Sequence, residues 1–127
     1  MIRIYQTIQG GGEQQGDCFR CCIASLLNLR AFDVPHFYDG GENGGFTSVE
    51  EDRALNDWLK PRGLLYFETG FKTTYYALLQ GMGDNNPDLA FILAGCTADG
   101  FTHSVVCRGN QIIHDPACEI IADPDNV

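Results

Sequence analysis

The stretch from Gly16 to Leu29 most constrains the fold, because it predicts an amphipathic helix that begins with a cysteine. Asp17 comes just before this helix and is a residue type that caps helices by accepting a backbone N–H bond. Cys18 then lies in the first turn, where the helix dipole favours a thiolate. Apolar side chains recur with the helical period and predict one buried stripe. They are Phe19, Cys22, Ile23, Leu26 and Leu27.

The composition is that of one globular domain. The chain has 127 residues, of which 44% are hydrophobic, so we expect a single domain over residues 1–127 with its own core. The formal net charge of −9 argues against nucleic acid or an anionic membrane as a partner. The sequence shows neither an apolar run of membrane-spanning length nor a signal peptide, so we expect a cytoplasmic protein.

The six cysteines are expected to be reduced thiols in that compartment. Cys18, Cys21 and Cys22 have a spacing that is compatible with zinc, but no second closely spaced cysteine pair follows them. Zinc sites in proteins need four ligands and commonly draw them from two such pairs. We therefore predict no metal and no cofactor, and keep a metal-stabilised structural protein as the least favoured interpretation.

Three helices are predicted, covering residues 18–29, 48–60 and 73–80. Ser48 to Glu51 form a capping box that starts the second helix, and Pro61 to Gly63 stop it. Its expected buried stripe consists of Ala54, Leu55, Trp58 and Leu59. Residues 82–88 are predicted to form a turn.

Strands are predicted mostly in the second half of the chain. Residues 89–94 form a nearly continuous apolar run, which is typical of a central strand. The other expected strands are residues 2–8, 64–67, 101–107 and 111–115. Because the main helices precede the main strands, we predict an α+β fold in which the Cys18 helix packs on a C-terminal antiparallel sheet.

A thiol in the first turn of a helix suggests acyl-transfer chemistry if a histidine and an acid can reach it. Attack on an acyl carbon needs a nucleophile, a base that takes its proton, and a third group that orients the base. Cys18 is the candidate nucleophile, and the chain offers three histidines as its base. His36 lies in a predicted loop, and His103 lies within a predicted strand. His114 lies beside Asp115 at the end of the next predicted strand, where we expect it to face away from His103.

This order of motifs resembles the papain-like cysteine peptidases, and among them the compact domains that process bacteriocin leader peptides. The matching residues are Gln6, Asp17-Cys18, His103-Ser104-Val105-Val106 and Asp115-Pro116. The resemblance spans nearly the whole chain. It implies a papain-like fold with Cys18 as nucleophile, His103 as general base and acid, and Asp115 as the orienting group. It also implies a protein or peptide substrate.

The sequence departs from this family before and after Cys18. Where the family has its oxyanion-hole glutamine, six residues before the cysteine, this chain has Gly12. We favour Gln6 for that role, together with the Cys18 backbone N–H, because the glycines at 10–12 let the chain loop out. The alternatives are Gln9, Gln14 and Gln15. Phe19 is bulky where many relatives carry a small residue, and either narrows the cleft or anchors the helix.

The turn after the His103 strand decides whether the triad can form. A three-residue turn, Arg108 to Asn110, places Asp115 opposite His103 on the same face of the sheet. A two-residue turn, Gly109-Asn110, moves Asp115 to the other face unless a bulge intervenes. Local turn chemistry favours two residues, whereas the triad requires the odd-length loop or the bulge.

The predicted function is a cysteine-dependent hydrolase, a peptidase or amidase, that uses a Cys18-His103-Asp115 triad through an acyl-enzyme thioester. The main alternative is a papain-like module that binds or inhibits a partner and whose triad is vestigial. A third possibility is a deamidase or transglutaminase with the same triad. Such a compact acidic protein suits a bacterium or a phage, and we expect a monomer or a small homo-oligomer.

Overall fold

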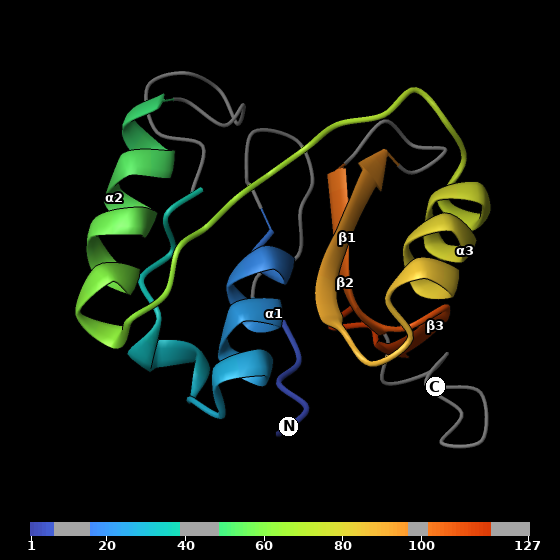
Figure 1. The fold of residues 1–127 in the computed structure, drawn as a ribbon. Coiled ribbons are helices and arrows are strands. Elements are labelled where there is room, and N and C mark those ends of the chain that lie inside the picture. The colour runs from blue at the N-terminus through green and yellow to red at the C-terminus, as the bar shows by residue number, and fades with distance from the viewer. Residues whose placement is uncertain (7–15, 39–48, 97–101, 118–127) are drawn as a thin grey trace.

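The computed structural model describes residues 1–6, 16–38, 49–96 and 102–117, and it has the predicted α+β class. Figure 1 shows the elements in chain order. They are α1 (Cys18–Leu27), η1 (Ala31–Asp33), α2 (Val49–Leu59), η2 (Lys60–Arg62), α3 (Tyr75–Asn85), β1 (Ala90–Cys96), β2 (Thr102–Arg108) and β3 (Gln111–His114). Among these described helices, none is both long and apolar enough to cross a membrane.

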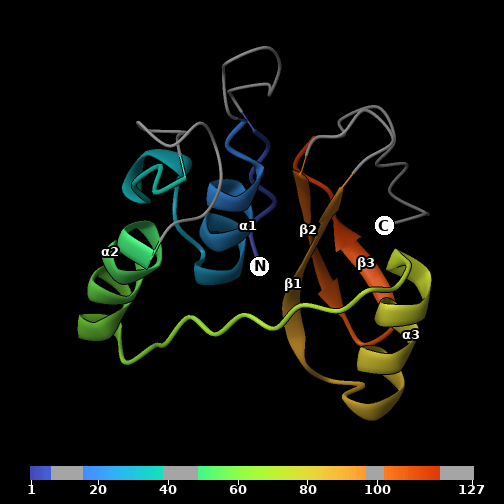
Figure 2. The same cartoon turned by 90° about the horizontal axis from the view of Figure 1, so that it is seen from above.

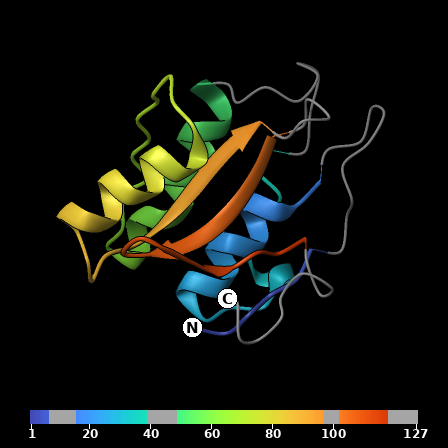
Figure 3. The ribbon, with the colours of Figure 1, turned by 90° about the vertical axis from the view of Figure 1, so that its right-hand side faces the viewer.

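The three strands form one antiparallel sheet in the order β1-β2-β3, and helices cover both of its faces. Within the described residues β2 is therefore the central strand, and β1, which was predicted to be central, lies at an edge. Helix α1 packs against β2, with α2 on the side of α1 that faces away from the sheet (Figure 2). Helix α3 lies across the opposite face (Figure 3). The core is correspondingly divided. One cluster joins α1 to α2 around Ile23 and Leu55, and the other joins α3 to the sheet around Leu79 and Val105.

Helix α1 forms as predicted but is buried on more than one face. It ends two residues earlier than expected, because Asn28 adopts a left-handed conformation with φ 56°. Cys21 and Ser25, outside the predicted stripe, are fully buried, since α2 lies on one side of the helix and the sheet on the other. Asp17 makes no side-chain cap bond; its buried carboxylate lies 3.8 Å from Arg20 Nη1 instead.

Helices α2 and α3 confirm the predicted helices but change their details. In α2, Leu55 and Leu59 are buried while Ala54 is exposed, so the stripe is narrower than predicted; Ser48, and with it the predicted capping box, lies outside the described residues. Helix α3 continues to Asn85, so the turn predicted over residues 82–88 begins only at Asn86. Gly83 explains the longer helix, because its Cα packs against the β2–β3 turn and the tertiary contact outweighs its weak helix propensity.

Two predicted strands do not form in the described residues. Residues 2–6 form no strand: their backbone hydrogen bonds include those to the side chains of Ser25 in α1 and of Asn28 just after it, and to residues 114 and 116. Residues 7 and 8 lie outside the described residues. Residues 64–67 belong to an extended connection that runs from η2 past α1 to α3 (Figures 1 and 2). Leu65 and Phe67 are largely exposed there, so apolar composition alone misidentified this segment.

Candidate active site

The β2–β3 hairpin combines a two-residue turn with a bulge. Arg108 pairs with Gln111 across the Gly109-Asn110 turn. The pairing then skips one residue: Cys107 lies opposite Ile112, but Val106 lies opposite His114. Ile113 is therefore the extra residue of a bulge. Continuing this register places Asp115 on the same face as His103, which is the arrangement that the triad requires.

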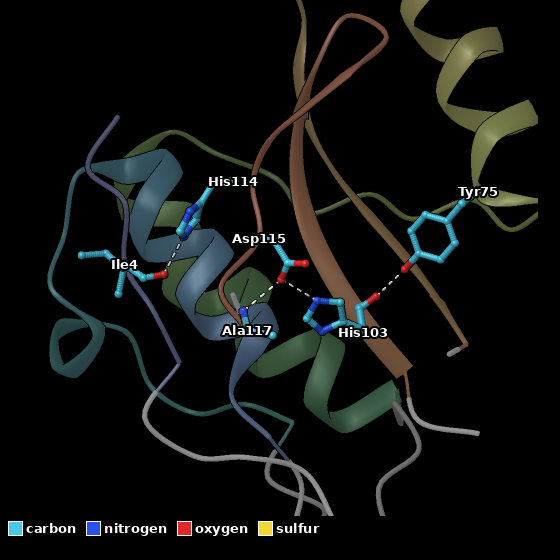
Figure 4. A network of polar contacts seen from close by, with 6 residues as sticks. All are labelled: Ile4, Tyr75, His103, His114, Asp115 and Ala117. Carbon is cyan, nitrogen blue, oxygen red and sulfur yellow. Dashed lines mark hydrogen bonds and ion pairs between the residues drawn. The ribbon is translucent and has the colours of Figure 1, made fainter. Parts of the chain in front are cut away.

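His103 and Asp115 are in direct contact. His103 Nε2 lies 2.7 Å from Asp115 Oδ1, and the backbone N–H of Ala117 donates to the same oxygen at 2.9 Å (Figure 4). The bond to Asp115 is the main cause that raises the pKa of His103 to about 10, and a second bond, to Cys18, adds to it. The imidazole therefore favours its charged form, and Asp115 fixes its orientation.

Cys18 is the thiol that reaches this pair. Burial disfavours its thiolate, but hydrogen bonds from the His103 side chain and the Ser104 backbone outweigh that cost, so the pKa of Cys18 is lowered. Because Nε2 of His103 is engaged with Asp115, we infer that Nδ1 makes the hydrogen bond to the thiol. The arrangement favours a thiolate–imidazolium pair at the start of α1, as the sequence indicated for Cys18.

The other described thiols have the opposite character. Burial raises the pKa of Cys21 and of Cys107 to about 12, and it raises that of Cys22 as well. These three side chains are fully buried, and none forms a disulfide. A reactive thiolate is thus favoured at Cys18 and disfavoured at its two neighbours on the helix.

The main chain of Gln6 contacts the residue that follows Asp115. Its backbone N–H donates to the carbonyl of Pro116 at 3.0 Å, which ties the end of the N-terminal segment to the residue after Asp115. This bond brings its main chain to the end of the sheet that carries the triad. The alternatives Gln9, Gln14 and Gln15 lie outside the described residues, and the oxyanion role of Gln6 stays a prediction.

The N-terminal segment holds β3 against α1. Ile4 donates its N–H to Ser25 Oγ at 3.0 Å and accepts a 2.7 Å bond from Nε2 of His114. His114 is fully buried and packs edge-on against Tyr5. It therefore faces away from His103, as expected, and it secures the end of β3, which Asp115 directly follows.

Phe19 anchors the first turn of α1. Its ring makes edge-to-face contacts with Tyr38 and Tyr66, at centroid distances of 5.2 and 5.8 Å. A small pocket of about 20 Å³ lies beside it, lined in part by Gly16 and His36. Of the two roles considered for Phe19, these contacts favour the anchor, because aromatic pairs of this geometry stabilise packing beyond the area that they bury.

The geometry gives no reason to assign a metal site. Among the described residues, no three histidine, cysteine or carboxylate side chains are arranged to hold a metal ion. Cys118 lies outside the described residues, as does the side chain of Cys96.

Comparison with known proteins gives one short similarity. No family model and no solved structure matches the chain. Part of the chain is 47% identical over 58 residues to the adenylosuccinate synthetases of Prochlorococcus marinus (strain MIT 9211) and Parasynechococcus marenigrum (strain WH8102). The match covers 46% of this chain and 13% of each synthetase. A segment of that length cannot contain both Cys18 and His103, so the similarity carries no information on the assembled triad.

The roles of two residues at the site were not predicted from the sequence. Ser104 contributes its backbone N–H and its hydroxyl to Cys18, and its side chain is buried. Tyr75 donates its hydroxyl to the His103 carbonyl at 2.7 Å. The sequence signal for the Tyr75 contact was Gly95, which lies in β1 opposite His103. A glycine inside a strand often marks the close approach of another group.

Proposed function

We propose that this protein is a cysteine-dependent hydrolase of amide or related acyl bonds, with a papain-like arrangement of Cys18, His103 and Asp115. The observation that carries the proposal is the continuous contact from Asp115 through His103 to Cys18, with the pKa of the histidine raised and that of the thiol lowered. A purely structural buried cysteine has its thiolate disfavoured, as Cys22 does. The motif resemblance and the α+β arrangement, with α1 on the sheet, support the same proposal.

The chemistry follows from these positions. The Cys18 proton passes to His103, and the thiolate sulfur bonds to the substrate carbonyl carbon while the carbonyl electron pair moves to oxygen. The Cys18 backbone N–H and the Gln6 side chain are proposed to stabilise this oxyanion. The carbon–nitrogen bond then breaks, and the amine leaves with the proton from His103. Water next gives a proton to His103, attacks the thioester, and releases the acid as Cys18 recovers that proton.

The expected substrate is a protein or peptide that presents an accessible acyl bond. The same intermediate would support deamidation of a glutamine side chain, or transfer if an amine replaced water. A module that binds a partner without turnover is the alternative that the experiments must distinguish from a hydrolase.

Thiol labelling with iodoacetamide tests the proposal without a known substrate. Cys18 should be alkylated selectively at mildly acidic pH, as mapped by peptide mass spectrometry, and His103→Ala should lose that selectivity. His36→Ala is the matched control, because His36 lies outside the triad. Uniformly slow labelling of all thiols, unchanged in His103→Ala, would refute a reactive thiolate.

Turnover is tested separately with p-nitrophenyl acetate. A catalytic Cys18 should release p-nitrophenolate and carry a transient acetyl group that is visible in the intact mass, and Cys18→Ala should do neither. Selective alkylation without any acyl-enzyme would assign the protein to the binding class.

A further inference from the structure

Tyr75, in α3, forms a hydrogen bond with the backbone of His103. Tyr75 is the first residue of α3, and Thr74 caps the helix by accepting the N–H of Ala77 at 3.2 Å. The Tyr75 hydroxyl donates to the His103 carbonyl oxygen at 2.7 Å (Figure 4). A rigid helix start is thereby joined directly to the catalytic strand, 28 residues away in the sequence.

Gly95 makes room for this contact. It is the cross-strand partner of His103, in β1. A Cβ atom at position 95 would lie 2.3 Å from Tyr75 Cε2 and 2.9 Å from Cζ, which is closer than such atoms can approach. The ring therefore lies against the glycine Cα, and only glycine allows the hydroxyl to reach the carbonyl.

The contact lies within the electrostatic reach of the triad. Tyr75 is half-buried, and burial is the main cause that raises its pKa to about 12, with the charges of Cys18 and Asp115 adding to it. The hydroxyl therefore stays protonated and keeps donating across the working range of a cysteine hydrolase. Its immediate neighbour Tyr76 is 77% exposed.

We propose that Tyr75 is a positioning residue for the hydrolase reaction, acting through the His103 carbonyl to set the direction of the imidazole toward Cys18. This inference rests on the proposed function. Asp115 fixes one end of the imidazole, and Tyr75 fixes the peptide group from which the side chain projects. Gly95 is the permissive partner of this contact. The Tyr75 ring does not itself take part in bond making.

The test is Tyr75→Phe, which keeps the ring over Gly95 and removes only the hydroxyl, with Tyr76→Phe as the matched control. A misdirected imidazole stabilises the thiolate less. The rate of Cys18 alkylation at pH 6 should therefore fall by about threefold to tenfold, the range expected for one hydrogen bond. The pH midpoint of alkylation should move upward, and Tyr76→Phe should match the wild type. Thermal unfolding of each variant shows whether the fold is kept.

A second readout keeps this inference distinct from the proposed function. The His103 ring protons, followed by NMR titration, should report a lower pKa in Tyr75→Phe than in the wild type. A lower melting temperature with unchanged alkylation and titration would reduce Tyr75 to a packing residue and overturn the inference. If wild-type Cys18 itself reacts as an ordinary thiol, the proposed function fails, and the titration alone then decides whether Tyr75 positions His103.

Discussion

His103 Nε2 and Asp115 Oδ1 lie 2.7 Å apart because β3, the second strand of the hairpin, contains one extra residue. With the two-residue turn alone, Asp115 would project from the opposite face of the sheet. The bulge at Ile113 reverses that alternation just before Asp115. A local irregularity in β3 thus brings the two side chains together, in keeping with the frequent occurrence of bulges beside active sites.

The alkylation rate of Cys18 should depend on pH with a midpoint below that of an ordinary cysteine thiol. Its pKa is lowered, since bonds from His103 and Ser104 outweigh burial, so thiolate is lost only as the pH falls through that lowered pKa. Hydrolysis should also decline at alkaline pH, near the His103 pKa of about 10, where the proton for the leaving amine is lost. A single rise in alkylation above pH 8 would contradict the ion pair.

Asp115→Ala should reduce kcat/KM for an ester substrate by about a hundredfold or more, within the range of general acid–base catalysis. The change removes the carboxylate that is the main cause of the raised His103 pKa and that holds the ring. Asp115→Asn keeps an acceptor oxygen without the charge, and should lose only about tenfold, as expected when orientation survives. Equal activity of Asp115→Ala and the wild type would remove Asp115 from the triad.

His114→Phe should lower the free energy of unfolding by about 1–3 kcal/mol, because it leaves the Ile4 carbonyl without its buried donor. His114→Gln retains an N–H donor and should lose less. Urea unfolding at neutral pH measures both variants. A His114→Phe variant as stable as the wild type would show that the Ile4 bond contributes little.

The same histidine should make the wild type less stable in acid. Burial lowers the His114 pKa in the folded protein, so below about pH 6.5 the unfolded chain takes up a proton that the folded one resists. Stability should therefore fall as the pH drops from 6.5 toward the folded pKa. His114→Gln should lose less stability than the wild type over this pH range. The same loss of stability in both proteins would show that His114 does not cause it.

Gly83→Ala and Gly81→Ala form a matched pair within α3. A Cβ at position 83 would lie 2.2 Å from the Asn110 backbone nitrogen, whereas position 81 has open space. Gly83→Ala should therefore destabilise the protein by about 1–3 kcal/mol through overpacking. Gly81→Ala should stabilise it by up to about 1 kcal/mol through helix propensity. Thermal unfolding checks both, and equal effects would contradict the close approach of α3 to the hairpin.

Much of the local structure was predictable from the sequence, because it depends on short-range periodicity and caps. The helical period predicted α1 with Cys18 in its first turn, and the apolar run near residue 92 predicted a strand, although β1 lies at an edge of the described sheet and not at its centre. The strand predicted over residues 64–67 does not form, because an apolar tetrapeptide carries no information on whether a pairing strand exists. Asp17 likewise had the right type for a cap, but its carboxylate turned toward Arg20.

The residue types available for chemistry, and most of the elements that carry them, follow from local sequence patterns. The contacts between those residues depend on how the elements pack. The side on which Asp115 projects depends on a single extra residue in β3, and sequence periodicity could not choose between a longer turn and a bulge. The contact of Tyr75 with His103 joins separate elements through the space left by Gly95. Such contacts arise from long-range packing, which no local pattern encodes.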